Sequence, residues 1–341
     1  MPTPHTILAH ANSVHALNRR SLLALAAGSA ALLASGVRAQ AYPGKAIKLI
    51  VPFNAGGATD IVARLLGDKL STRLGQPVLI DNRGGAAGIL GTDAVAKAAP
   101  DGYTFVLSLS NSLMTNQFLY DKLPYNTQRD LALVSHIASA PVTLVVHPSV
   151  PANNGPELLQ YIANNKKKLS YGSWGVGSYA HLAGSHMSLT QQADMVHIAY
   201  KGEAPMLQDL IGGQLQMAYA SAAGSKPHIE AGKLKIIGVT GLKRMSALPN
   251  VATLNEQGLK DEVYSIAGWV GMAAPANTPK DIIQRISQEV QSICETQEVA
   301  DRISAMGFTV TAGTPEAFAV SYKKDMPIWE KMVKQSGAKL E

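Results

Sequence analysis

The sequence contains a single cysteine, Cys294, among 341 residues. One thiol can form neither an intrachain disulfide framework nor a thiolate metal cluster. A nucleic-acid-binding pattern is missing too, because no run of Lys and Arg is interleaved with aromatic residues. The densest basic cluster, residues 166–168, follows two asparagines and is interpreted as the solvated end of a helix. Disulfide-stapled scaffolds and zinc-cluster domains are thereby excluded.

Long apolar runs are scarce, and the one candidate lies near the N-terminus. Arg19 and Arg20 precede an apolar run over residues 22–33, and small residues at 37–41 offer a cleavage site. The run is shorter than the roughly 20 residues that a membrane-spanning helix needs. We therefore interpret residues 1–41 as an export signal that is removed, by the general or the twin-arginine route. A retained membrane anchor is the weaker alternative.

Removal of this segment also lowers the charge. Without its three arginines, 27 basic and 24 acidic residues remain, a net charge of +3. Such a mild excess indicates no polyanionic partner. About 300 residues remain, which is enough for two hydrophobic cores of ordinary size.

Strand-like apolar runs alternate with helical patterns in two groups. The first group comprises residues 47–51 before 61–70, 78–80 before 89–96, and 105–109 before a polar loop. The second comprises 169–171 before 180–189, 196–199 before 205–211, and then 215–218 and 234–239. Helical patterns close the chain over 281–294 and after Pro315. This alternation predicts two α/β units, each a mainly parallel sheet flanked by helices.

Two extended stretches are candidates for the connections between the units. Residues 137–146 and 263–272 are long and apolar, but Pro141 interrupts one and Gly268 the other. Interrupted strands can pass between lobes and act as hinges. Two ordinary strands with bulges fit the pattern equally well.

The glycine-rich loops carry the chemistry. Residues 50–60 (IVPFNAGGATD) predict a strand that runs through a glycine loop into a helix. The first turn of a helix leaves N–H groups unpaired, with roughly half a positive charge, and glycines let a ligand approach them. Such a site prefers an anion. A tight strand-to-helix turn without a ligand is the alternative for any one loop.

Two further glycine loops, at residues 82–88 and 172–178, favour the anion site. Each lies between a strand and a helix, and the three loops are divided between the two units, which predicts one cleft lined by both. Ser178 is placed to cap the helix that carries His181. Ser173 and Trp174 are candidates to face a ligand, although Trp174 also fits a core position.

Enzyme signatures are missing. No glycine loop continues into Gly-Lys-Ser/Thr, and neither G-x-S-x-G, H-E-x-x-H nor the G-x-G-x-x-G spacing occurs at these loops. His181 and His186 are five residues apart, so one helix face does not align them as metal ligands. Asp60 has no nearby base or nucleophile. We expect no catalytic residue, no metal and no cofactor.

Several short motifs spread over the chain are together specific. They are residues 51–60 (VPFNAGGATD), 74–77 (LGQP), 81–83 (DNR), 100–104 (PDGYT), 200–202 (YKG), 227–234 (PHIEAGKL) and 274–279 (APANTP). With these motifs the chain resembles the substrate-binding proteins of tripartite tricarboxylate transporters, known as TctC or Bug receptors. The resemblance covers essentially everything from residue 42 onward.

The resemblance implies a two-lobed periplasmic-binding-protein (venus-flytrap) fold with two hinge-crossing strands. One lobe would comprise residues 42–141 and 264–320, and the other 142–263, with a C-terminal helix over 321–341 packing across or on the second lobe. The loops 53–60 and 173–181 would pinch a carboxylate ligand through amides, hydroxyls and water. The predicted ligand-binding residues are Phe53, Asn54, Ala55, Gly56, Gly57, Thr59, Asp60, Asn82, Ser110, Ser173, Trp174, Gly177, Ser178, His181, Tyr200, Ala220 and Ser221.

The resemblance also implies partners and location. The protein would be a periplasmic monomer that delivers a mono-, di- or aromatic carboxylate to the large and small membrane subunits of a transporter. Lys201 would lie near the cleft or form a turn. Many relatives have an aspartate where this chain has Ala220, and an acid there could pair with a ligand's amino group, so we expect no amino acid ligand. A carboxylate-sensing receptor of a signalling system and a hydrolase are the alternatives.

Overall fold

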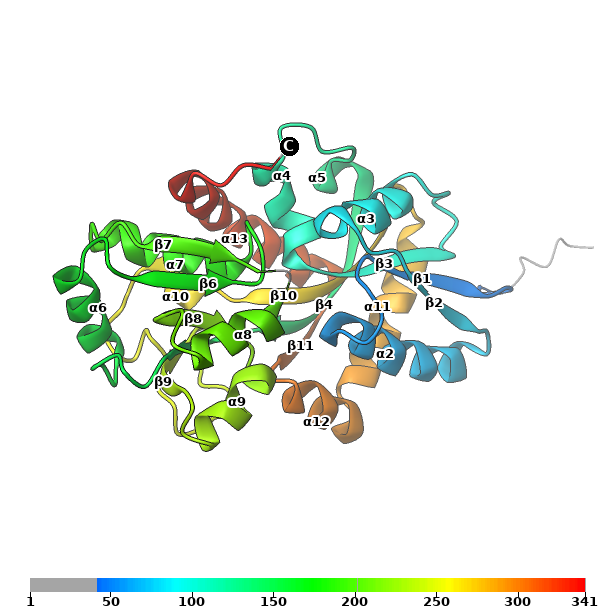
Figure 1. The fold of residues 1–341 in the computed structure, drawn as a ribbon. Coiled ribbons are helices and arrows are strands. Elements are labelled where there is room, and N and C mark those ends of the chain that lie inside the picture. The colour runs from blue at the N-terminus through cyan, green and yellow to red at the C-terminus, as the bar shows by residue number, and fades with distance from the viewer. Residues whose placement is uncertain (1–41, 201, 341) are drawn as a thin grey trace, which may run out of the picture. The chain divides into compact units, whose positions relative to one another are not determined.

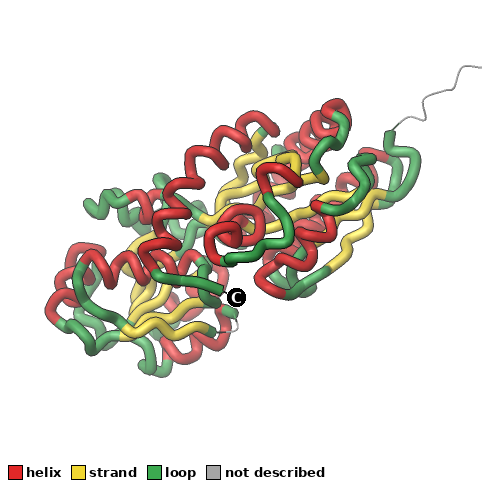
Figure 2. Tube along the Cα trace, turned by 90° about the horizontal axis from the view of Figure 1, so that it is seen from above, coloured by secondary structure: helices red, strands yellow, loops and turns green. Residues whose placement is uncertain are grey.

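The computed structural model describes residues 42–200 and 202–340, of which 43–340 belong to one compact unit. The predicted export signal, residues 1–41, lies outside the described residues. Strands form two sheets, which helices flank (Figures 1 and 2). The first has the order β11-β4-β10-β3-β1-β2 and the second β7-β6-β8-β5-β9. Two α/β units were predicted, and two are found.

The first sheet contains β1 (Ile47–Val51), β2 (Val78–Asn82), β3 (Thr104–Leu109), β4 (Leu131–Ala140), β10 (Gly268–Pro275) and β11 (Thr309–Gly313). The second contains β5 (Thr143–Val146), β6 (Ser170–Ser173), β7 (Val196–Ala199), β8 (Met217–Ala220) and β9 (Lys235–Val239). The helices are α2 (Ala58–Leu74), α3 (Ile89–Ala96), α4 (Asn116–Leu119), α5 (Thr127–Asp130), α6 (Gly155–Asn164), α7 (Tyr179–Thr190), α8 (Glu203–Ile211), α9 (Ala222–Glu230), α10 (Glu262–Ser265), α11 (Lys280–Cys294), α12 (Gln297–Ala305) and α13 (Pro315–Ser336). A 3₁₀ turn (Ala86–Gly88) precedes α3, and a π-helical turn (Asn111–Thr115) precedes α4.

The sheets are mixed, which corrects the prediction of mainly parallel sheets. Strand β1 pairs in parallel with β2 and β3, but β10 runs antiparallel to both β3 and β4. In the second sheet β6 pairs in parallel with β7 and β8, whereas β5 is antiparallel to β8 and β9. The antiparallel strands β5 and β10 follow the crossings between the sheets. Apolar runs reveal that a segment is a strand but carry no information on its direction.

The chain crosses from the first sheet to the second at Pro141. Strand β4 ends at Ala140 and β5 begins at Thr143, because proline has no N–H to continue a ladder. The segment that leads back to the first sheet is less extended than predicted, because residues 262–265 form α10 and β10 begins only at Gly268. The two crossings are joined: Gly268 pairs with Ala140, and the N–H of Val142 donates to Oγ1 of Thr240 (2.9 Å).

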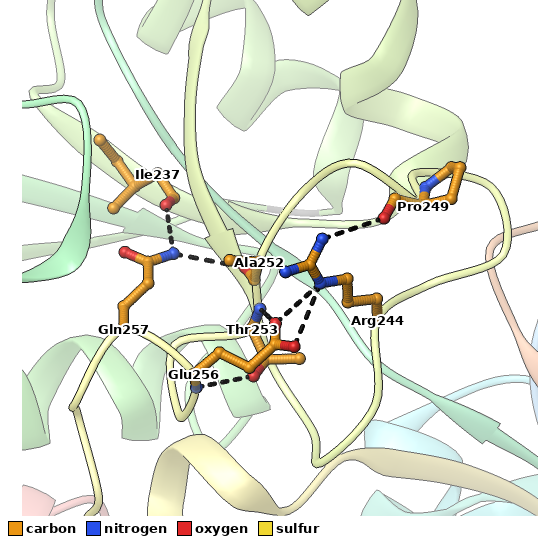
Figure 3. A network of polar contacts seen from close by, with 7 residues as sticks. All are labelled: Ile237, Arg244, Pro249, Ala252, Thr253, Glu256 and Gln257. Carbon is orange, nitrogen blue, oxygen red and sulfur yellow. Dashed lines mark hydrogen bonds and ion pairs between the residues drawn. The ribbon is translucent and has the colours of Figure 1, made fainter.

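A polar network orders the connection between β9 and α10 (Figure 3). Arg244 Nε pairs with Glu256 Oε2 at 2.9 Å, and the same oxygen accepts the N–H of Thr253 at 2.7 Å. The amide of Gln257 donates to the carbonyl of Ile237 in β9 (2.8 Å). Both charged partners are about half exposed, so their pairing contributes little free energy. Its effect is to fix the course of the loop that leads back to the first sheet.

Helix α13, red in Figure 1, contacts β4 of the first sheet and also α7, a helix that packs on β6 and β8 of the second. Its buried residues include Phe318, Tyr322 and Trp329. One apolar cluster runs from the first sheet to the second and includes Val106 and Leu144. The lobe boundaries at residues 142 and 264 stay a prediction, which the membership of the strands supports.

The centre of the first sheet should dominate stability. Leu107 of β3 is fully buried between β1 and β10, whereas Leu79 of the edge strand β2 is 54% exposed. We expect Leu107→Ala to lower the free energy of unfolding by about 2–5 kcal/mol, because it removes contacts and leaves a cavity. Leu79→Ala should change it by less than about 0.5 kcal/mol. Urea unfolding of both variants measures the difference, and equal losses would contradict this account of the core.

Candidate functional site

A cavity of about 510 Å³ lies where both sheets present the carboxyl ends of strands. Its lining comes from the segments after β1, β3, β6 and β8, from both crossings and from α13. Ligands of open α/β sheets bind at this end of the strands. A hollow of about 590 Å³ along α9 and α12 contains none of the predicted residues. Of these two hollows, only the cavity of about 510 Å³ is a place where several helix starts meet, and we take it as the candidate site.

The loop before α2 presents backbone amides to the cavity. Gly57, Ala58 and Thr59 line it, and Gly57 is the N-cap without a side-chain hydrogen bond to the helix. The first intrahelical bond runs from the N–H of Ile61 to the carbonyl of Gly57. The amides before Ile61 therefore have no partner within the helix. Gly56, with φ +87°, makes the turn that aims the helix start.

Asp60 ties this loop together from behind. Its carboxylate accepts the N–H of Gly56 (2.8 Å), Nε of Arg64 (3.0 Å) and Nδ2 of Asn82 (2.9 Å). Asn82 also donates to the carbonyl of Phe53 (3.1 Å). Burial alone would raise the pKa of Asp60, but these hydrogen bonds outweigh it and hold the pKa below the ordinary 3.8. Neither Asp60 nor Asn82 lines the cavity, because both are used in shaping the loop.

The loop before α7 brings the second sheet to the cavity. Ser178 caps the helix by accepting the N–H of His181, and the N–H of Gly177 donates to Nδ1 of the same imidazole (3.0 Å). Gly177 has φ +75°, and an added Cβ there would lie 2.2 Å from Leu119 of α4. Only glycine therefore lets this loop approach the first sheet so closely. Gly175, Val176, Gly177 and Ser178 all line the cavity.

His181 does not line the cavity, and its ring stacks on that of His197, with centroids 3.9 Å apart. Burial lowers the pKa of both imidazoles to about 4, and for His197 the charge of His181 adds to the effect. Both rings are therefore neutral at pH 7, and Nδ1 of His181 serves as an acceptor. Ser173 is equally occupied, since its hydroxyl donates to the carbonyl of Gly175 (3.0 Å).

The third helix start at the cavity belongs to α9. Ser221 is its N-cap and accepts the N–H of Gly224 (2.9 Å). The carboxylate of Glu203 accepts the N–H of Ser221 (3.0 Å) and its hydroxyl (2.7 Å). Glu203 and Ser221 line the cavity, whereas Ala220 is buried in β8. An acid is therefore present at the cavity although position 220 carries alanine, and no sequence pattern indicated Glu203.

The structure brings about half of the predicted residues to the cavity. Those that line it are Phe53, Gly57, Thr59, Ser110, Trp174, Gly177, Ser178 and Ser221. Those that do not are Asn54, Ala55, Gly56, Asp60, Asn82, Ser173, His181, Tyr200 and Ala220. The hydroxyl of Tyr200 instead donates to Asp209 (2.7 Å), and Lys201 lies outside the described residues. Ligand contact stays a prediction for the first group.

Sequence reasoning missed several lining residues. These are Asn111, Thr115 and Asn116 around the π-helical turn, Trp269 of β10, Phe308 before β11, Trp329 of α13 and Glu203 of α8. The polar loop after residue 109 was a usable signal for the first three. The aromatic residues come from chain segments more than 90 residues beyond the last of the glycine loops, so local patterns could not assign them.

Within the described ranges no three His, Cys, Asp or Glu side chains come together as metal ligands. Cys294 is buried in α11, and burial raises the pKa of its thiol to about 12. Over the same ranges, every helix is too short or too polar to cross a bilayer.

The role of Asp60 can be tested by its pH dependence. We expect Asp60→Asn to lower the free energy of unfolding at pH 7 by about 1–3 kcal/mol, because a neutral amide cannot satisfy the same donors. The folded pKa is depressed, so this stabilisation is present above the ordinary pKa of 3.8 and is lost as pH falls through the lowered value. The gap between the variant and the wild type should therefore narrow below about pH 4.

Urea unfolding from pH 7 to pH 3 measures this gap. Asp68→Asn, at an exposed position of the same helix, is the matched control and should stay within about 0.5 kcal/mol of the wild type. A gap that is independent of pH would show that the charge of Asp60 is not what holds the loop.

Known proteins share both this sequence pattern and this fold. Residues 62–337 match the family described as "Tripartite tricarboxylate transporter family receptor". The protein BugT of Bordetella pertussis is 33% identical over 310 residues, which cover 91% of this chain and 94% of BugT.

Two solved structures agree over most of the chain. The periplasmic binding protein BugD is 32% identical, with a TM-score of 0.73 over 88% of this chain and all of BugD. Rpa4515 of R. palustris, solved with adipate, is 32% identical, with a TM-score of 0.77 over the same shares. The predicted two-lobed α/β fold is thereby confirmed. The chain belongs to the tripartite tricarboxylate transporter receptor family, whose members are solute-binding receptors and not enzymes.

Proposed function

We propose that this receptor binds a small organic carboxylate in the cavity and delivers it, in the periplasm, to the membrane subunits of a tripartite tricarboxylate transporter. The observation that carries the proposal is the convergence of three helix starts, those of α2, α7 and α9, on one cavity. Among the described lining residues no arginine, lysine or histidine is present. Anion recognition there falls to backbone amides and hydroxyls.

The charge and hydrogen-bond energy that the helix starts supply suit one carboxylate. Each helix start contributes roughly half a positive charge, so α2 and α7 together offset about one negative charge. A hydrogen bond from an amide to a charged group contributes about 1.5–3 kcal/mol. Ser110 and Ser178 add hydroxyl groups at the same cavity. A few such bonds in an enclosed site reach the roughly −8 kcal/mol of micromolar binding.

The remaining walls suit an apolar or aromatic ligand body. Phe53, Trp174 and Trp269 line the cavity, and its volume lies within the ~300–1,000 Å³ of ordinary ligand sites. The adipate in the related R. palustris structure supports the carboxylate class.

Delivery is part of the proposal. The N-terminal pattern of residues 1–41 supports export, and the family match supports a large and a small membrane subunit as partners. We place the lobe boundaries at residues 142 and 264, with capture by a monomer that closes through bending at Pro141 and Gly268. The adjoining crossings, where Gly268 pairs with Ala140, support this hinge, and α13 contacts β4 on one side of it and α7 on the other.

A thermal-shift screen tests the ligand class. Succinate, adipate, citrate, hexanoate, benzoate and terephthalate are the probes, with neutral hexanamide as control. At 100 times its dissociation constant a ligand stabilises the folded state by about 2.7 kcal/mol, which raises the melting temperature by several degrees. We expect at least one carboxylate to do so and hexanamide to have no effect. Inertness of every carboxylate at millimolar concentration would contradict the proposal.

One amide can be removed without disturbing its helix. Ala58 is the first residue of α2, and proline is favoured at that position, where its missing N–H has no helical partner. Gly57 before it is already extended (φ −79°, ψ 167°), as proline requires. We expect Ala58→Pro to weaken carboxylate binding by about 1.5–3 kcal/mol, or about 10- to 100-fold in Kd, because a charged hydrogen bond is lost.

Isothermal titration with the best ligand of the screen measures this loss. Gln297→Pro makes the same change at the first residue of α12, away from the cavity, and Ala58→Ser retains the amide. Both should bind within about twofold of the wild type, a difference of less than about 0.5 kcal/mol. An Ala58→Pro protein that binds as tightly as these two would show that the α2 amide is not a ligand contact.

A further inference from the structure

Glu203 is the only acidic or basic side chain among the described residues that line the cavity. It is the first residue of α8, and both of its oxygens face the start of α9: Oε2 accepts the N–H of Ser221 and Oε1 its hydroxyl. An added Cβ at Gly224 would lie 1.8 Å from Oε1, so this position of the carboxylate requires glycine there. The acid is held at a defined place in the cavity wall.

This carboxylate already occupies the anion-binding end of α9. The start of that helix would otherwise attract a negative group of the ligand, as the starts of α2 and α7 do. With Glu203 bound there, the positive end of α9 is offset by the protein's own charge. In the described part of the cavity, two helix starts thus remain for a ligand. Together they can offset about one negative charge.

A second ligand carboxylate would lie close to Glu203. A sphere of 510 Å³ is about 10 Å across, similar to the ~8 Å over which physiological salt screens charges. Like charges at such separations in a partly enclosed site repel each other. A neutral or positively charged group at the far end of the ligand is not repelled in this way. The carboxylate of Glu203 also has further lone pairs, which can accept hydrogen bonds from such a group.

We infer that Glu203 determines which charge the far end of the ligand can carry: the cavity selects a monocarboxylate with a neutral or cationic far end over a dicarboxylate. The inference rests on the proposed function and narrows its ligand class. It replaces the expectation drawn from Ala220, because the acid that could pair with an amino group comes from α8 and not from the end of β8.

Ligands of equal length that differ only at the far end test the inference. Hexanoate, 6-aminohexanoate and adipate form a six-carbon set, and butanoate, 4-aminobutanoate and succinate a four-carbon set. In the wild type we expect the dicarboxylate of each set to bind at least tenfold more weakly than the amino acid. Glu203→Gln should tighten dicarboxylate binding about tenfold, weaken amino acid binding about tenfold and change the simple monocarboxylate by less than about threefold.

Two control variants separate charge from structure. Ser221→Ala breaks the same hydrogen bond but keeps the charge of Glu203, so the order of the ligands should persist. Glu262→Gln removes an exposed acid from the first position of α10 and should match the wild type. Titration calorimetry gives each Kd, and thermal unfolding confirms that each variant is folded.

The possible failures are distinguishable. If carboxylates bind but Glu203→Gln shifts all members of a set equally, or weakens the dicarboxylate, the inference is wrong and the proposed function stands. The same holds if the wild type prefers the dicarboxylate. If no carboxylate of either set or of the screen binds, both the inference and the proposed function are wrong.

Discussion

A helix start leaves amide groups that its own backbone cannot satisfy, and this requirement governs the site. At α7 and α9 the loops satisfy part of it internally, through Ser178 and through Ser221 with Glu203, whereas Asp60 of α2 binds the N–H of Gly56 just before the helix start. These partners fix the loops in one conformation. The amides that remain, at Ala58 and Thr59 above all, are thereby held ready for an anion without further rearrangement.

The sequence was sufficient where local pattern decides structure. The bounds of β1, α3 and β7 were predicted to the residue, because each is a clear apolar run or helical pattern between turn residues. The direction of β5 and β10 was not predictable, since it depends on how the chain returns between sheets. Residues 263–265 were expected to be extended but form part of α10, where local hydrogen bonds such as Ile266 N–H to Glu262 compete with strand pairing.

The site was predicted in the same uneven way. The glycine loops correctly indicated the helix starts. A backbone with positive φ, or one that packs closely against a neighbouring segment, favours glycine, and glycine is visible in the sequence. Whether a polar side chain near such a loop faces the cavity or the loop itself depends on hydrogen-bond partners that are distant in sequence. Asp60 and Asn82 are 22 residues apart and satisfy each other, so neither is presented to the cavity.

Glu203 shows why a single strand end is a poor basis for predicting ligand charge. Position 220 ends β8 and carries alanine, from which we predicted that the ligand is not an amino acid. The acid comes instead from α8, the helix that precedes β8 in the chain, and Gly224 of α9 provides the space for it. In a site that recognises charge through helix ends, an internal carboxylate changes the net potential as effectively as a ligand does. The charge selectivity of such a receptor therefore follows from the sum over helix starts and wall residues, in which Glu203 is the one acidic side chain among the described lining residues.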